Sequence, residues 1–219
     1  MFSRQKKRLK NLYRGDKRVG IWRQQKLLYI RIPKSGNSSI MAALGGAKKT
    51  RMSAPEILRL DDSWTAFSFV RNPWSRLVSA FTQKAGDSPT SARVVDGIYQ
   101  GFIEQGIPIR ADMSFEEFCE IVCDIPDGKT DKHLCSQASF LIYKKKPIVP
   151  FIGKIERMDE DWSRLLQQLG LDNELPHINR TGKKGVHYSH FYKDEEIVKL
   201  VGDRYADDIR YFNYDFKRQ

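Results

Sequence analysis

The chain has 219 residues and a formal net charge of +11, and 40% of its residues are hydrophobic. Such a length suits one domain that buries roughly 70% of its unfolded surface, so it needs no disulfide staples to hold a core. No stretch approaches the ~20 apolar residues of a membrane span, and no apolar signal-peptide core follows the basic start. We therefore expect a cytoplasmic protein with an anionic partner, such as a polyanionic cofactor or acceptor.

Residues 1–26 are predicted to form a basic N-terminal extension. Its basic run consists of Arg4, Lys6, Lys7, Arg8, Lys10, Arg14, Lys17 and Arg18. A run of this kind is more often a solvated tail or amphipathic helix than an arm that touches an anionic membrane. Peripheral membrane contact through this run is the second interpretation.

The next segment is a short apolar run that ends in a polar turn and then continues into a second apolar run. Residues 27–32 are predicted to form a buried strand, and a helix is predicted to start after the turn. The turn contains Ser35, Gly36, Asn37, Ser38 and Ser39. Its backbone N–H groups can point at one anion, and Lys34 adds a mobile positive charge. The turn is not a Walker A loop, and its alternative is an ordinary strand-to-helix connection capped by Ser or Asn.

A second strand and helix follow in the same order. Ala66, Phe67, Phe69 and Val70 are predicted to form a strand that ends at Arg71, and Pro73 is placed to begin an amphipathic helix. Ser79 lies two turns into that helix. In an open α/β sheet the ligand binds outside the carboxyl ends of the strands, so Arg71 and the Lys34 turn should converge on one ligand. Alternating strands and helices predict an α/β fold with a central parallel sheet flanked by helices.

The two segments, IPKSGNSSI and FSFVRNPWSRLVSAF, resemble the cofactor loops of carbohydrate sulfotransferases that use 3′-phosphoadenosine 5′-phosphosulfate (PAPS). Further segments follow in the family's order. FIGKIERMDEDWSRLLQQLGL resembles its G-[KR]-x-E strand and helix, LPHINRT resembles its L-P-H-x-N-[RK]-[ST] segment, and residues 192–216 resemble its last helix. The resemblance implies one domain, residues 27–219, with a P-loop-like sulfotransferase fold. The family includes the Golgi-type enzymes and their soluble bacterial relatives. The lack of an anchor segment favours the soluble form.

The resemblance also implies roles for residues of the two loops. Lys34 would bind the 5′-phosphosulfate and neutralise charge on the bridging oxygen as the S–O bond breaks. Arg71 and Ser79 would bind the 3′-phosphate, for which a planar guanidinium is well suited. Ser38 and Ser39 would add donors, and Arg180 is a further candidate cofactor contact. Positioning and electrostatics would supply most of the acceleration, and no metal is expected.

A general base must take the proton of the acceptor hydroxyl, and His133 is our candidate. It lies in KHLCSQ, which resembles the family's H-x-x-P/S-Q element, where a histidine faces the acceptor. The other histidines are His177, His187 and His190, and the fallback bases are Glu116, Glu117 and Asp131. The region before this element is predicted to carry helices over 91–105 and 114–122 and to form the acceptor wall.

The cysteines number three and do not suggest a disulfide framework. Cys119, Cys123 and Cys135 could in principle join His133 as zinc ligands. Their spacing matches no standard zinc pattern, so we expect reduced thiols and no metal.

We therefore predict transfer of the sulfuryl group of PAPS to a hydroxyl of a carbohydrate or glycolipid acceptor, with 3′-phosphoadenosine 5′-phosphate (PAP) as product. One alternative is a small nucleotide-dependent kinase, which should need magnesium. Another is a non-enzymatic nucleic-acid-binding protein, which the charge and several aromatic residues would suit. We expect no nucleic-acid partner, because neither alternative accounts for the ordered set of motifs.

Overall fold

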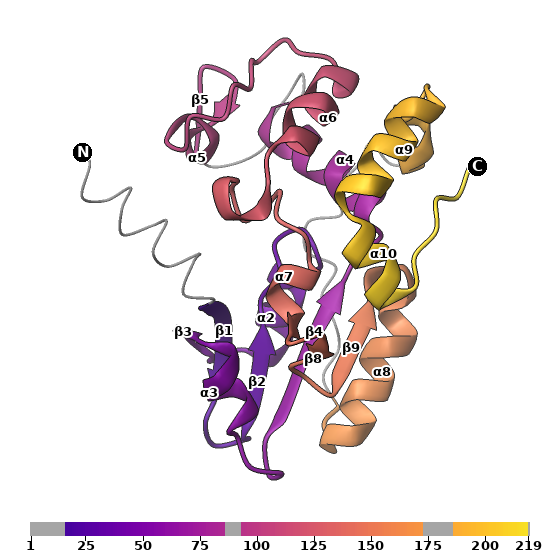
Figure 1. Ribbon diagram of the computed structural model, residues 1–219. Coiled ribbons are helices and arrows are strands. Elements are labelled where there is room, and N and C mark those ends of the chain that lie inside the picture. Colours follow the sequence, from indigo (N-terminus) through magenta and orange to yellow (C-terminus); the bar gives the residue numbers. More distant parts are fainter. Residues whose placement is uncertain (1–15, 86–92, 173–185, 219) are drawn as a thin grey trace. The chain divides into compact units, whose positions relative to one another are not determined.

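The computed structural model describes residues 16–85, 93–172 and 186–218 (Figure 1). The chain divides into two compact units. The first unit comprises Met1–Arg71 and Gln137–Arg180, and the second comprises Asn72–Ser136 and Thr181–Gln219. Each unit is described by itself below.

The first unit is built on a five-stranded sheet with the order β3-β1-β2-β4-β9. The strands are β1 (Lys17–Trp22), β2 (Leu27–Ile30), β3 (Lys48–Met52), β4 (Thr65–Val70) and β9 (Phe151–Lys154). Strands β2, β4 and β9 are parallel to one another, whereas β1 pairs antiparallel with both β2 and β3. The α/β class is confirmed, but the sheet is mixed rather than wholly parallel.

The antiparallel part of the sheet arises from the turn between β1 and β2. Only residues 23–26 connect these strands, and Lys26 has a left-handed backbone with φ 51°. So short a connection can join antiparallel strands but not parallel ones. The sheet therefore takes in residues 17–22 of the predicted N-terminal extension.

Helices and a small hairpin complete the first unit. They are α2 (Asn37–Leu44), α3 (Ala54–Leu58), α7 (Ala138–Leu141), the hairpin β7 (Ile142–Tyr143) and β8 (Lys146–Pro147), the 3-10 turn η2 (Ile155–Arg157) and α8 (Met158–Leu169). Figure 1 shows α8 running alongside β9. The ring of Trp162 on α8 lies 6.2 Å from the ring of Phe69 on β4, between ring centroids. Aromatic packing therefore fixes the helix on the sheet and holds β4 in place.

A glycine on β9 makes the close approach of that strand to β4 possible. Gly153 pairs with Phe69 in the parallel register, and a Cβ atom there would lie 2.3 Å from Phe69 Cε1. We predict that Gly153→Ala lowers the free energy of unfolding by about 1–3 kcal/mol, because a buried ring must shift. Urea denaturation measures this effect, and Ser163→Ala on the exposed face of α8 is the control. An unchanged unfolding midpoint would show that the Phe69 ring moves without cost.

The second unit is mainly helical. Its elements are α4 (Pro73–Lys84), β5 (Val94–Val95), β6 (Ile98–Tyr99), α5 (Gln100–Ile103), α6 (Phe115–Asp124), the 3-10 turns η1 (Asp127–Lys129) and η3 (Tyr188–Phe191), α9 (Glu195–Arg204) and α10 (Ala206–Phe212). Aromatic side chains fill its core, where the ring centroids of Phe81 and Phe118 lie 5.2 Å apart. No helix in the described part of the chain combines the length and the apolar character needed to cross a bilayer.

One of the two helices predicted in this unit is confirmed, and the other is largely wrong. Ser114 caps α6 in a capping box with Glu117, at the start of the predicted helix over 114–122. The predicted helix over 91–105 is instead a hairpin, β5 and β6, followed by the single turn α5. Asp96 and Gly97 both have positive φ, of 49° and 76°, as a two-residue hairpin turn requires. The turn chemistry of Asp-Gly therefore wins over the helical spacing of the apolar residues.

Candidate active site

The first candidate feature is the Lys34 loop, residues 33–39, which connects β2 to α2. Lys34 and Gly36 have left-handed backbones, with φ 71° and 68°. The left-handed backbone at Gly36 favours glycine, and a Cβ atom there would also require the end of the Ile155 side chain to move, because it would lie 2.7 Å from Cδ1. The N-cap residue of α2 is Gly36, so no side-chain hydrogen bond caps the N–H groups of its first turn. The first turn of α2 therefore offers backbone donors and the positive end of the helix dipole to an anion.

The hydroxyl and amide side chains of the loop differ in what they contact. Asn37 accepts a hydrogen bond at Oδ1 from Arg31 Nε, at 3.1 Å. Ser35 is fully buried, Ser39 is buried and Ser38 is exposed. Ser38 is therefore the loop serine that is most open to solvent, whereas the Ser35 hydroxyl contacts the interior of the unit.

Gln137 joins the Lys34 loop to the end of β4. Its side chain is fully buried, and its Oε1 atom accepts hydrogen bonds from Ser35 Oγ at 3.0 Å and from Arg71 N at 2.8 Å. Its Nε2 atom donates to Arg71 O at 2.7 Å. The guanidinium of Arg71 also approaches Lys34 O, with 3.5 Å from Nη1. The predicted convergence of Arg71 on the Lys34 loop is thus present in the structure.

Ser79 and Arg180 are the two other residues predicted to bind the cofactor. Ser79 lies in the middle of α4, in the second unit, and is 2% exposed. Arg180 lies outside the described residues, as does His177. The binding roles of Ser79 and Arg180 stay predictions.

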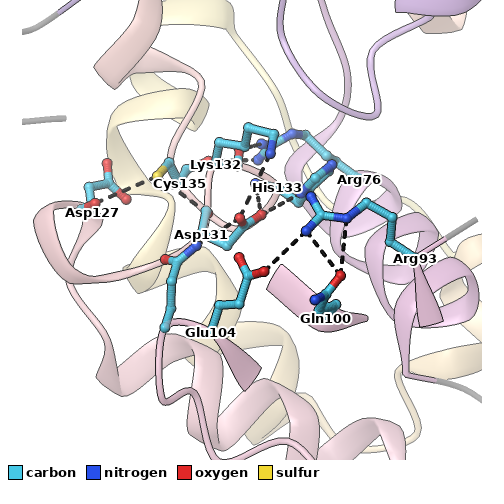
Figure 2. A network of polar contacts seen from close by, with 10 residues as sticks. Arg76, Arg93, Gln100, Glu104, Asp127, Asp131, Lys132, His133 and Cys135 are labelled. Carbon is cyan, nitrogen blue, oxygen red and sulfur yellow. Dashed lines mark hydrogen bonds and ion pairs between the residues drawn. The ribbon is translucent and has the colours of Figure 1, made fainter. Parts of the chain in front are cut away.

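The second candidate feature is a group of polar side chains around His133, in the second unit (Figure 2). The Nδ1 atom of His133 forms a hydrogen bond with Asp131 Oδ1, and Oδ2 of the same carboxylate accepts from Gln105 Nε2 at 2.9 Å. The imidazole and the ring of Tyr99 are nearly perpendicular, with 5.3 Å between centroids and 81° between planes. A carboxylate at Nδ1 favours the tautomer with its proton there, which leaves Nε2 to accept a proton.

Burial determines the charge states in this cluster. It lowers the pKa of His133, and the hydrogen bond to Asp131 only partly reverses this, so the imidazole is neutral near pH 7. Burial alone would raise the pKa of Asp131, but the hydrogen bonds from His133 and the nearby Lys132 ammonium outweigh it and keep the carboxyl ionised. Burial also lowers the pKa of Lys84 to about 8. The Lys84 ammonium lies 3.5 Å from the centroid of the Tyr99 ring.

The backbone of the segment that carries His133 is firmly held. Arg76 on α4 is 2% exposed and donates from Nη1 to Cys135 O at 2.8 Å and from Nη2 to Lys132 O at 3.4 Å (Figure 2). Tyr205 donates its hydroxyl to Leu134 O at 2.8 Å. These bonds orient the histidine by fixing the chain on both sides of it. Arg76 was given no role from the sequence, although it lies within the segment FSFVRNPWSRLVSAF.

The fallback bases and the other histidines have different surroundings. Asp131 is the partner of His133, and Glu117 is used by the cap of α6 and by an ion pair with Arg110. His187 contacts Ser189, with 2.8 Å between Nδ1 and Oγ, and His190 is exposed. Of the described histidines, His133 is the one held by a buried carboxylate.

The three cysteines are free thiols. Burial raises the pKa of Cys123 and of Cys135 to about 12, so both are protonated near pH 7. Across the ranges that the structure describes, no cluster of three or more His, Cys, Asp or Glu side chains is arranged to hold a metal ion.

Comparison with known proteins places these features in a family. The model of the sulfotransferase family matches residues 18–215. The chain is 26% identical over 247 aligned positions to carbohydrate sulfotransferase 9 of Homo sapiens. This alignment covers 93% of this chain and 54% of that protein. It is 25% identical over 165 positions to carbohydrate sulfotransferase 14 of Danio rerio, covering 68% of this chain and 43% of that protein. The chain thus spans about half the length of these curated relatives. No solved structure matches it significantly.

Proposed function

The chain belongs to the sulfotransferase family, and from this membership we propose that it transfers the sulfuryl group of PAPS to a carbohydrate hydroxyl. The observation that carries the donor side is the junction of the Lys34 loop with Arg71, at the carboxyl ends of the adjacent parallel strands β2 and β4. This is the edge of an α/β sheet at which ligands bind. The acceptor class is proposed from the names of the two curated relatives, and a glycolipid would present the same hydroxyl chemistry.

On the donor side, the two loops would hold the two anionic ends of PAPS. The first-turn N–H groups of α2 would bind the 5′-phosphosulfate, where the Lys34 ammonium would neutralise charge that develops on the bridging oxygen. The Arg71 guanidinium would form charge-assisted hydrogen bonds to the 3′-phosphate. The reaction would leave PAP in these loops.

On the acceptor side, His133 would act as the general base. Its neutral imidazole would take the proton of the acceptor hydroxyl at Nε2. The Asp131 carboxylate, hydrogen-bonded to Nδ1, would stabilise the imidazolium that results. Its bond to Gln105 keeps that carboxylate in place.

We propose testing the donor by calorimetric titration of PAP, AMP and magnesium ATP. Arg71→Ala should weaken PAP binding about 10- to 100-fold, because it removes hydrogen bonds to a charged group. AMP lacks the 3′-phosphate, so its affinity should change much less. Arg23→Ala, which removes an equal charge at the exposed turn between β1 and β2, is the matched control.

Binding of magnesium ATP and of RNA separates the proposal from its alternatives. Tighter binding of magnesium ATP than of PAP would favour the kinase. A kinase would also be expected to place an acidic magnesium ligand near Asn72, whose side chain instead accepts from Ser75 N at 3.2 Å and donates to Asp215 O at 2.9 Å. Salt-sensitive RNA binding that survives Arg71→Ala would favour the nucleic-acid binder.

Most of the basic N-terminal run lies outside the described residues. Residues 1–15 lie outside the described residues, whereas Lys17 and Arg18 belong to β1. Membrane contact through the basic run and a cytoplasmic location are therefore proposals, which vesicle co-sedimentation and cell fractionation would test.

A further inference from the structure

We propose that Gln137 is a positioning residue that couples the two ends of the donor site, so that binding at one loop strengthens binding at the other. The inference rests on the proposed function, because it assigns the Lys34 loop and Arg71 to the two ends of PAPS. Gln137 would touch neither end. It acts through the two segments that do.

The single side-chain amide of Gln137 hydrogen-bonds to two separate loops, whereas an ordinary buried hydrogen bond joins only two groups. The Nε2 and Oε1 atoms pair with both Arg71 O and Arg71 N, at 2.7 and 2.8 Å, as a neighbouring strand would. The Oε1 atom also accepts from Ser35 Oγ at 3.0 Å. The backbone at Arg71 and the turn at Ser35 are therefore held at a fixed separation by one side chain.

The neighbours of the amide also fix its orientation. Two donors, Arg71 N and Ser35 Oγ, face the oxygen, and a carbonyl, Arg71 O, faces the nitrogen. A flipped amide would set N–H against N–H and oxygen against oxygen, which is costly for a group that is fully buried. Glutamate could accept both hydrogen bonds but could not donate one while ionised. Methionine has a similar length and makes none of the three.

A rigid connection between two binding segments produces cooperativity. Without Gln137, each loop would lose its own conformational freedom when one end of the ligand binds. With Gln137, ordering of the Lys34 loop also orders the backbone at Arg71, so the second end binds to a site that is already organised. Couplings of this kind typically amount to about 5- to 150-fold in affinity.

The experiment measures this coupling with four ligands: adenosine, 3′-AMP, 5′-AMP and PAP. The product of the Kd values of 3′-AMP and 5′-AMP, divided by the product of the Kd values of PAP and adenosine, gives the coupling factor. In Gln137→Met the factor should fall by about 5-fold or more relative to the wild type. Gln167→Met, at an exposed position of α8, makes the same exchange away from the loops and should keep the wild-type factor.

A second variant tests the coupling even if Gln137→Met folds poorly. In Gln137→Glu the carboxylate cannot donate to Arg71 O at about pH 8. Burial at this position raises the pKa of the introduced carboxyl above its ordinary value of about 4.3, so at about pH 5 the protonated carboxyl can donate. The coupling factor, taken relative to wild type at each pH, should therefore be low at the higher pH and recover at the lower. A purely structural role predicts no such recovery in a variant that is folded at both values.

The outcomes separate this inference from the proposed function. If wild-type protein binds PAP no better than either monophosphate, the proposed function is wrong. If wild-type protein prefers PAP, and Gln137→Met or folded Gln137→Glu at high pH keeps the wild-type coupling factor, the role of Gln137 is overturned while the function stands.

Discussion

His133→Ala should lower kcat for sulfuryl transfer by about 10²- to 10⁴-fold, the usual contribution of a positioned general base. The affinity for PAP should stay near the wild-type value, because the residue acts on the acceptor. The physical basis is a neutral imidazole whose Nδ1 is held by the Asp131 carboxylate (Figure 2). Steady-state kinetics with a carbohydrate acceptor, together with PAP titration, measures both quantities. His190→Ala, at an exposed position, is the control.

The pH dependence gives an independent test of this role. A base must be unprotonated, so activity should fall as the pH drops through the pKa of His133. Burial lowers that pKa from its ordinary value of 6.5, so the acid limb of kcat/KM should lie below pH 6.5. In Asp131→Asn the charge that raises the pKa is lost, so the limb should move to still lower pH while kcat falls. If the acid limb is unchanged in both His133→Ala and Asp131→Asn, the general base is another residue.

The positions of the two loops that are proposed to bind the cofactor could be predicted because each is a local pattern. An apolar run that ends in a polar turn, followed by a helix start, places the Lys34 loop and Arg71 at the ends of β2 and β4. The rule that ligands bind at the carboxyl ends of parallel strands then brings the two together. Their proximity in the structure follows from the parallel register of these strands.

The connection between the loops could not be predicted in this way. Gln137 lies 102 positions after Ser35 and 66 after Arg71, so no local spacing links them. The segment KHLCSQ was identified through its histidine, and its last residue, Gln137, was given no role. Arg76 was missed for a similar reason, because its partners are backbone carbonyls at Lys132 and Cys135. A buried polar residue that binds backbone leaves no side-chain pattern in the sequence.

The hairpin of β5 and β6 shows the opposite case. The local signal for its turn was present in the sequence, but the prediction followed the helical spacing of the apolar residues instead. Asp96 and Gly97 form a typical two-residue hairpin turn, but the strands on either side have only two residues each. Strands so short show no alternation, and the apolar residues around them also fit a helical spacing. The structure of this region therefore depends on turn chemistry that periodicity alone does not reveal.

Lys34→Met should lower kcat by about 10²- to 10³-fold, comparable with the loss of one preorganised donor to charge that develops in a transition state. Methionine keeps a similar unbranched chain at a position with φ 71°, so the change removes the charge with little change in shape. PAP has no sulfuryl group, and its affinity should fall far less than kcat.

This contrast between kcat and affinity distinguishes catalysis from simple binding by Lys34. Charge on the bridging oxygen grows only as the S–O bond breaks, so an ammonium that neutralises it stabilises the transition state more than the bound donor. A loss that falls equally on kcat and kcat/KM fits this role. A rise in KM for PAPS with unchanged kcat would show instead that Lys34 binds the donor uniformly. Lys49→Ala, which removes an exposed charge on β3, should change neither constant.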